Sequence, residues 1–265
     1  MNAQPNAPVE PRKVDAGRGW SWIAEAFQMF KQAPGTWIAI LLVYLVIMVA
    51  ATAVPGASLL LNLFNPVFSA GMILACSSQA AGKGVKIDHL FAAFKGGQMG
   101  QLVLLALLYM VALIAIMLVG VLIALLGFGL SPTHLASSGV PDQYVLPLLL
   151  VFLILVALFI PVAMGMWLAP ALIALRGLGP VDAFKLSFRA CLINFVPLLL
   201  YGIFGLLIAI VATIPLALGW LVAAPVFIIS VYTAYRDMFP PPPPDFNAQP
   251  DFNATQPIPV PPPLV

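Results

Sequence analysis

The sequence predicts an all-α fold, a polytopic bundle of six transmembrane helices, and three observations point to this class. Hydrophobic residues make up 62% of the 265-residue chain and charged residues only 8%, against about 45–50% and about 25% in soluble domains. A soluble fold needs a charged surface, which 11 basic and 9 acidic side chains cannot provide for this much apolar area. The charges are also confined to short segments between long apolar blocks.

The apolar blocks are each long enough to cross a bilayer twice, since one crossing takes about 20 apolar residues in a helix. Residues 32–82 and 190–235 carry no charge, and Asp142 alone interrupts residues 96–175. Only helices satisfy the backbone polar groups of such segments in hydrocarbon. The expected spans are Trp37–Val54, Gly56–Ser77, Leu102–Leu130, Leu146–Leu175, Phe195–Ile214 and Leu216–Ala234.

The basic residues fix the expected orientation. All 11 lie before the first span, after the last, or in the two loops that follow the even-numbered second and fourth spans. The positive-inside rule therefore places both termini in the cytoplasm. The first 35 residues lack the apolar core of a cleavable signal peptide, so the first span is expected to act as its own insertion signal. Cys76 and Cys191 lie in a span and at the cytoplasmic side, which predicts no disulfide.

Three segments on the expected cytoplasmic side share one pattern, an acidic residue followed by two phenylalanines and a basic residue. Residues 20–31, 87–95 and 180–189 carry it. Aromatic rings on one face and charges on the other are typical of helices that lie in the headgroup region. The candidate membrane-interface residues are Trp20, Phe27, Phe30, Lys31, Phe91, Phe94, Lys95, Phe184, Phe188 and Arg189.

The even-numbered spans repeat a second marker, a Pro-Val pair at Pro66, Pro161 and Pro225. A proline inside a helix removes a backbone hydrogen bond and kinks the helix. Together with the surface segments, these pairs predict three parallel repeats, each an amphipathic helix and a helical hairpin with a kinked return helix. The units are residues 18–82, 83–177 and 178–237. The middle unit is longer, so its hairpin is expected to tilt, to break at Gly120 or Gly127, or to project beyond the bilayer.

The residues of most enzyme and metal sites are missing from this sequence. His89 and His134 fall on opposite membrane faces in the expected topology, and no zinc-protease motif or Ser-His couple occurs. No charged side chain is expected inside the membrane, so proton relays lack their usual groups. The sequence therefore predicts no enzyme activity, no cofactor or metal, and no nucleic-acid partner.

Two amides form the candidate polar site inside the membrane. Asn62 and Asn65 precede Pro66, which frees a backbone carbonyl one turn earlier. They could line a small polar site, or they could hydrogen-bond a neighbouring helix, as intramembrane asparagine commonly does.

The two ends of the chain are expected to be disordered and cytoplasmic, at residues 1–17 and 238–265. The C-terminal segment contains Pro240–Pro244 and two Asp-Phe-Asn-Ala units. Such composition cannot form a core and samples polyproline II. It is either a solvated tail or a ligand for a cytoplasmic partner.

Residues 17–37, GRGWSWIAEAFQMFKQAPGTW, resemble the start of a family of uncharacterised proteobacterial inner-membrane proteins. More distantly, the six-span pattern is similar to the membrane domain that accompanies some glycerophosphodiester phosphodiesterases. The first resemblance covers residues 17–237 and implies a bacterial inner-membrane location, but no activity.

These patterns lead to two functional hypotheses. The first is a non-enzymatic envelope protein that handles lipid or acts as a scaffold, with the bilayer and anionic phospholipid as partners of its basic, aromatic segments. The alternative is a small-molecule permease with a pathway near Asn62, Asn65 and the kinked even-numbered spans.

Overall fold

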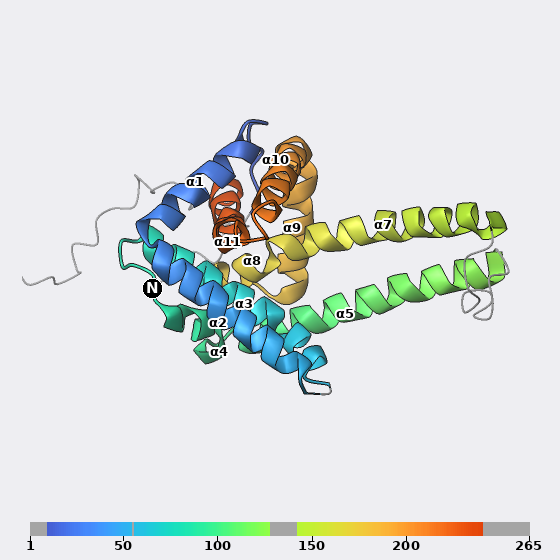
Figure 1. The fold of residues 1–265 in the computed structure, drawn as a ribbon, viewed down its shortest axis with the longest axis horizontal. Helices are drawn as coiled ribbons and strands as arrows, with labels where there is room; N and C mark the ends of the chain where they lie inside the picture. The colour runs from blue at the N-terminus through green and yellow to red at the C-terminus, as the bar shows by residue number, and fades with distance from the viewer. Residues whose placement is uncertain (1–9, 55, 128–141, 241–265) are drawn as a thin grey trace, which may run out of the picture.

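The computed structural model describes residues 10–54, 56–127 and 142–240, and no strand occurs among them. Three helical hairpins leave a common region and point in different directions (Figure 1). We call this region the hub; it contains the short helices α1, η1, α4, α8 and α9. Within the described residues six helices are long and apolar enough to cross a membrane, in agreement with the expected number of spans.

The first hairpin follows the amphipathic helix α1 (Arg18–Gln32) and consists of α2 (Pro34–Thr52) and α3 (Ala57–Ala80). Proline at the first position of α2 suits the start of a helix, where its missing N–H leaves no bond unmade. Pro66 lies inside α3, as expected. The second surface segment then forms a short 3-10 helix, η1 (Ile87–Phe91), and a four-residue helix, α4 (Ala92–Lys95), where a longer amphipathic helix was expected.

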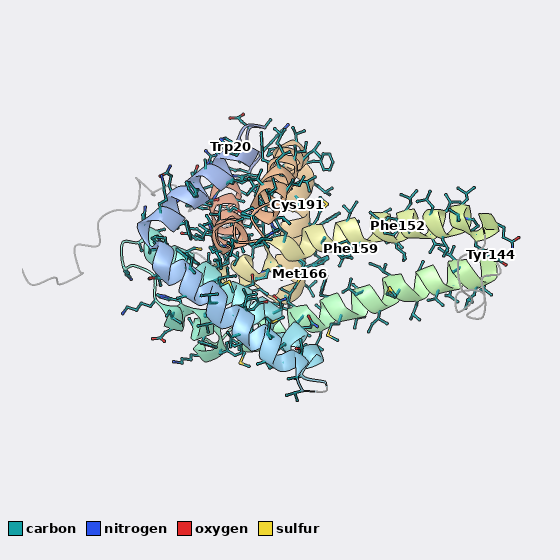
Figure 2. The ribbon with its side chains drawn as sticks, in the orientation of Figure 1. Trp20, Tyr144, Phe152, Phe159, Met166 and Cys191 are labelled. Carbon is teal, nitrogen blue, oxygen red and sulfur yellow. The ribbon has the colours of Figure 1, made fainter. Side chains whose placement is uncertain are left out.

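The middle hairpin is the longest and extends away from the hub (Figure 1). It contains α5 (Met99–Leu122), which continues into the π-helical turn η2 (Ile123–Gly127), then the 3-10 turn η3 (Asp142–Tyr144) and α7 (Val145–Trp167). The regular helix therefore passes through Gly120, against which Leu155 of α7 packs, and ends before Gly127. Its outward side chains are apolar, including Phe152 and Phe159 (Figure 2).

The fourth expected span is divided at Leu168 into α7 and α8 (Ala169–Arg176). Ser187 of α9 occupies this break: its hydroxyl donates to the carbonyl of Met164 at 2.7 Å and accepts from the Leu168 N–H at 3.0 Å. One side chain thus replaces the missing helical hydrogen bond, and Ser187 is fully buried. Nothing in the sequence indicated that Ser187, in the expected amphipathic segment 180–189, would bridge a helix break.

The third hairpin follows α9 (Pro180–Ile193) and consists of α10 (Phe195–Thr213) and α11 (Trp220–Met238). The sixth helix begins four residues later than the expected Leu216, because Leu216 and Ala217 adopt left-handed backbone angles in the connecting turn. It also continues beyond the expected Ala234 to Met238, so Asp237 belongs to its last turn.

The surface elements pack in a circuit around the hub. Helix α1 contacts the third hairpin through α10 and α11, η1 and α4 contact the first through α3, and α9 contacts the second through α7. Each surface element after α1 therefore packs mainly on the hairpin that precedes it in the sequence, and less on the hairpin that follows it. Helix α1, which has no preceding hairpin, packs on the third one and so completes this circuit of contacts. Two glycines allow close approaches between these elements: a Cβ on Gly71 would lie 2.5 Å from the Leu90 carbonyl oxygen, and one on Gly165 would overlap the Phe184 ring.

The N-terminal segment differs from its expected disorder over residues 10–17. The Arg12 N–H donates to the carbonyl of Met238 at 2.9 Å, and the Val14 N–H donates to Oδ1 of Asn194 at 2.8 Å. These residues therefore cross the ends of α11 and α9. The expected disordered residues 1–9 and most of the proline-rich tail, 241–265, lie outside the described residues, as does the loop 128–141 with His134.

Candidate functional site

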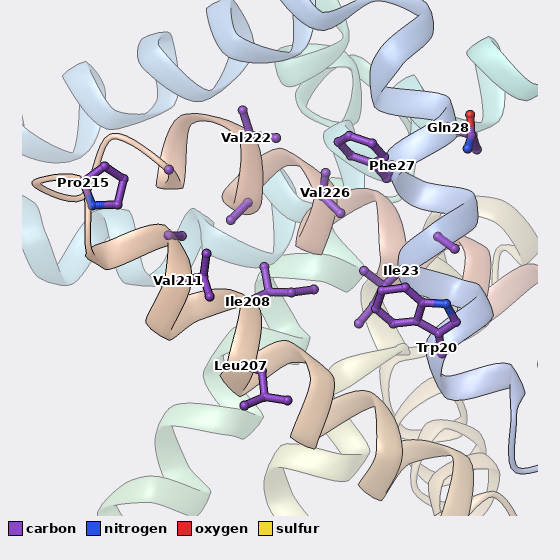
Figure 3. Close-up of a pocket in the computed structure, with 14 residues that line it drawn as sticks. Trp20, Ile23, Phe27, Gln28, Leu207, Ile208, Val211, Pro215, Val222 and Val226 are labelled. Atoms are coloured by element: carbon purple, nitrogen blue, oxygen red, sulfur yellow. The ribbon is translucent and has the colours of Figure 1, made fainter.

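An apolar groove lies between α1 and the third hairpin. It encloses about 740 Å³ and is walled by Trp20, Ile23 and Phe27 from α1 and by aliphatic side chains from α10 and α11. Figure 3 shows these side chains facing each other, with Gln28 near one end and Pro215 near the other. The groove therefore runs from the surface helix along the hairpin toward its loop, and its volume is in the range of ligand sites.

The aromatic residues that were expected to share one face of α1 differ in exposure. Trp20 and Phe27 are 49% and 42% exposed and line the groove, whereas Phe30 is buried. The buried face instead contains Trp22, which the expected stripe omitted. Its ring lies 6.4 Å from that of Trp167 and its N–H is bonded to Asp237, so the packing of α1 on α11 decides which face is buried.

Lys31 is the exposed cation beside this aromatic face. Its Nζ lies 5.2 Å from the centre of the Phe27 ring, a cation–π contact. Within the described residues Lys31 has no acidic partner. Lys31 therefore offers a positive charge next to an apolar groove.

The other candidate interface residues form two further sets. Phe91 and Phe94 pack against Phe68 of α3, with ring centres 6.1 and 5.0 Å apart, and Lys95 is exposed. In α9 the three residues are partly buried Phe184, which packs on Gly165, partly buried Phe188 and exposed Arg189. The structure therefore keeps the three sets on three different hairpins and does not bring them into one site.

Asn62 and Asn65 line a second cavity, of about 480 Å³, between α3, α5 and the α7–α8 junction. Among the described residues neither side chain makes a hydrogen bond, so neither binds a neighbouring helix. Nearby polar groups come from distant parts of the sequence, which spacing alone could not bring together. The lining residues are Asn62, Asn65, Pro66, Ser69, Ala106, Tyr109, Met110, Leu113, Met166, Trp167 and Pro170.

A buried carboxylate organises the hub and was missed by the sequence reasoning. Asp237 is 8% exposed; its Oδ1 accepts from Arg12 at 2.7 Å, and its Oδ2 accepts from Arg18 at 2.5 Å and from the Trp22 indole at 2.9 Å. Glu25 bridges Arg18 and Arg236 beside it, at 2.9 and 2.6 Å. The hydrogen bond to Asp237 raises the pKa of Arg18 against the opposing effect of burial, so the guanidinium stays charged.

This carboxylate is bonded like a structural group and not like a catalytic base. Each carboxylate oxygen of Asp237 already accepts from at least one donor, and none of the cavities described above is lined by Asp237. The described residues contain no group of three or more metal-ligating side chains. Its only sequence signal was an acidic residue beside Arg236 at a span end.

Comparison with known proteins gives one informative relative. A probable inner membrane protein of Burkholderia thailandensis is 30% identical over 217 residues, which cover 77% of this chain and 78% of the relative. The chain belongs to the family of this inner membrane protein. No protein-family model matches the chain, and no solved structure matches it.

Membership in this family agrees with the six apolar helices. The identity extends over most of both chains, as expected if the hairpins of the inner membrane protein and of this chain correspond.

Proposed function

We propose that this chain is a non-enzymatic, lipid-handling protein of the bacterial inner membrane that holds an anionic phospholipid in the groove between α1 and the third hairpin. The observation that carries the proposal is the combination of an apolar groove with the exposed cation Lys31 at the α1 side of it. The relative's name supports the location, and the basic segments support cytoplasmic termini.

The groove suits an acyl chain because it runs along a hairpin that lies in lipid. Between apolar surfaces in a bilayer, association depends on close van der Waals packing and not on the hydrophobic effect. The groove offers such packing on both sides, from Trp20 and Phe27 on α1 and from Val222 on α11. An acyl chain in this position would keep its headgroup at the level of α1.

Lys31 suits the phosphate of that headgroup. A basic side chain near an anionic membrane surface contributes about 1 kcal/mol to lipid attraction. That energy corresponds to about a fivefold change in affinity. Lys31 therefore favours an anionic headgroup, and the groove favours the acyl chain of the same lipid.

The packing circuit supports the expected three parallel repeats. Each surface element precedes a hairpin in sequence and lies on the preceding hairpin in space, which a threefold arrangement would produce. A scaffold role would use the same circuit, with the proline-rich tail as the site for a cytoplasmic partner. The similarity to the membrane domain of glycerophosphodiester phosphodiesterases stays a prediction.

The test is native mass spectrometry of the full chain purified from membranes. We expect retained phosphatidylglycerol or cardiolipin, and about fivefold weaker retention in Lys31→Gln. Val222→Trp should block the groove by filling it with an indole ring. Lys83→Gln removes the same charge from an exposed loop outside the groove and is the matched control.

The proposal fails if Lys31→Gln and Lys83→Gln lose lipid equally, because the charge would then act without the groove. It also fails if Val222→Trp retains as much phospholipid as the wild type.

The alternative permease is favoured by one observation, the cavity that Asn62 and Asn65 line. Its pathway would pass between α3 and α5 near the kinked return helices. Solute flux into liposomes that contain the purified chain, and loss of that flux in Asn65→Leu, would support it. Liposomes that stay sealed to small uncharged solutes would refute it.

A further inference from the structure

We propose that the cavity between α3, α5 and the α7–α8 junction binds an uncharged, hydroxyl-bearing ligand, a polyol that is either free or the headgroup of a neutral lipid. The cavity shares no lining residue with the lipid groove, so this inference is independent of the proposed function.

The first argument is that the two amides need a partner. The side chains of Asn62 and Asn65 make no hydrogen bond within the described residues. Both side chains are exposed and not buried in protein, so in hydrocarbon, where an amide without a hydrogen bond costs about 2–7 kcal/mol, their partner must come from outside the chain. A cavity with two such groups therefore favours a molecule that can both accept from and donate to an amide.

The second argument is that two backbone acceptors at this cavity have no regular helical hydrogen bond. Pro66 carries no N–H for the carbonyl four residues earlier in α3. Helix α7 ends at Trp167, so the carbonyl of the residue before it is one of the last four in the helix, which have no partner within it. Those carbonyls belong to Asn62 and Met166, and both residues line the cavity. A ligand with hydroxyl hydrogens can donate to such carbonyls.

The third argument concerns charge. Among the residues that the structure describes, no aspartate, glutamate, lysine, arginine or histidine lines the cavity. A charged ligand would be desolvated without an opposite charge nearby, which is costly in a low-dielectric site. The polar side chains that are present, including Ser69 and Tyr109, carry hydroxyls that donate and accept. A neutral polyol matches this lining.

The fourth argument concerns depth and size. Pro66 lies about 21 Å along α3 from its end at Ala80, at 1.5 Å per residue, which is well inside a hydrocarbon core of about 30 Å. A volume of about 480 Å³ is large for a few waters and within the range of small-ligand sites. The site is therefore a cavity at the depth of the membrane, and a ligand could reach it from the aqueous phase or from the lipid.

The experiment is equilibrium binding to the full chain in nanodiscs, with labelled glycerol, myo-inositol and monooleoylglycerol as probes and glycerol 3-phosphate as the charged comparison. We expect saturable binding of at least one neutral probe and at least tenfold weaker binding of the charged one. Binding of the free polyols would indicate a ligand that enters from the aqueous phase. Binding of the monoacylglycerol alone would indicate a lipid headgroup.

Asn62→Leu combined with Asn65→Leu removes the amides and should weaken binding at least tenfold. The two amides make no hydrogen bond within the described residues, so the fold should persist without them. Met110→Trp keeps the amides but fills the cavity, and should also abolish binding. Thr52→Val removes an exposed hydroxyl near the end of α2, away from the cavity, and should bind as the wild type does.

Three results would overturn the proposal: no saturable binding of any neutral probe to the wild type, equal binding of glycerol 3-phosphate, or full binding by the double leucine variant. Phospholipid retention in the groove should be unchanged in that variant, which separates this inference from the proposed function.

Discussion

Replacement of Asp237 by asparagine removes the charge that joins the N-terminal segment to the last turn of α11. The side chain is 8% exposed and accepts from Arg18 at 2.5 Å and from Trp22 at 2.9 Å. Asparagine keeps the shape, but its amide nitrogen would face a donor. We therefore expect Asp237→Asn to lower the free energy of unfolding and to release residues 10–17.

The size of this loss follows from the exposure of each partner. A hydrogen bond to a charged group contributes about 1.5–3 kcal/mol when it is buried. The Trp22 and Arg18 bonds approach that case, since Trp22 is fully buried and Arg18 is 33% exposed. Arg12 is 55% exposed, so its pair contributes less than about 1 kcal/mol. The loss should be about 3 kcal/mol.

The assay is reversible unfolding in mixed micelles, followed by tryptophan fluorescence. Arg18→Gln and Arg12→Gln, each combined with Asp237→Asn, give double-mutant cycles. The Arg18 coupling should exceed the Arg12 coupling. Glu10→Gln is the matched control, because its exposed pair with Arg189 at 3.5 Å should add nothing measurable.

The reasoning is refuted if Asp237→Asn costs under about 1 kcal/mol, or if the Arg12 coupling is the larger of the two. Either result would mean that water reaches the carboxylate and replaces its partners.

Four shorter predictions concern other parts of the hub and the topology. Ser187→Ala should lower the free energy of unfolding by about 2 kcal/mol, because it leaves two buried backbone groups unpaired, whereas Ser187→Thr should restore most of it in the same assay. Gly71→Ala should cost about 2 kcal/mol or more, since its Cβ would meet backbone that cannot move aside, and thermal unfolding checks this. Burial raises the pKa of the Cys191 thiol to about 12, so alkylation at pH 8 should be slow until the chain unfolds. As pH rises from the unfolded thiol pKa of about 8.5 toward that value, the thiol's contribution to stability should fall, which a series of unfolding midpoints would show. Reporter fusions should read external at Pro215 and cytoplasmic at Gly179, and one inverted result would refute the expected topology.

The spans could be predicted because their cause is local. An uncharged stretch of about 20 residues has no low-energy alternative to a helix in lipid. Two exceptions were not visible in composition. The break at Leu168 depends on a hydroxyl from another helix, α9. The late start of α11 depends on the local turn at Leu216 and Ala217.

The partners of each surface element could not be predicted, because periodicity shows which face is apolar and not what covers it. Trp20 and Trp22 are both aromatic, and the positions of α7, α10 and α11 decide that Trp22 is buried. The sequence singles out Asn62 and Asn65 as a pair, whereas Tyr109 and Trp167 reach the same cavity from distant segments. These contacts depend on how the hairpins are arranged.

The contact between Arg12 and Asp237 joins residues 225 positions apart. During synthesis Arg12 leaves the ribosome long before Asp237 is made. The basic N-terminal segment therefore stays without this acceptor until α11 has been inserted. Before α11 is inserted, Arg12 lacks this acceptor, whereas Arg18 can already pair with Glu25 within α1. Insertion of α11 therefore supplies the negative charge that fastens the N-terminal segment in place.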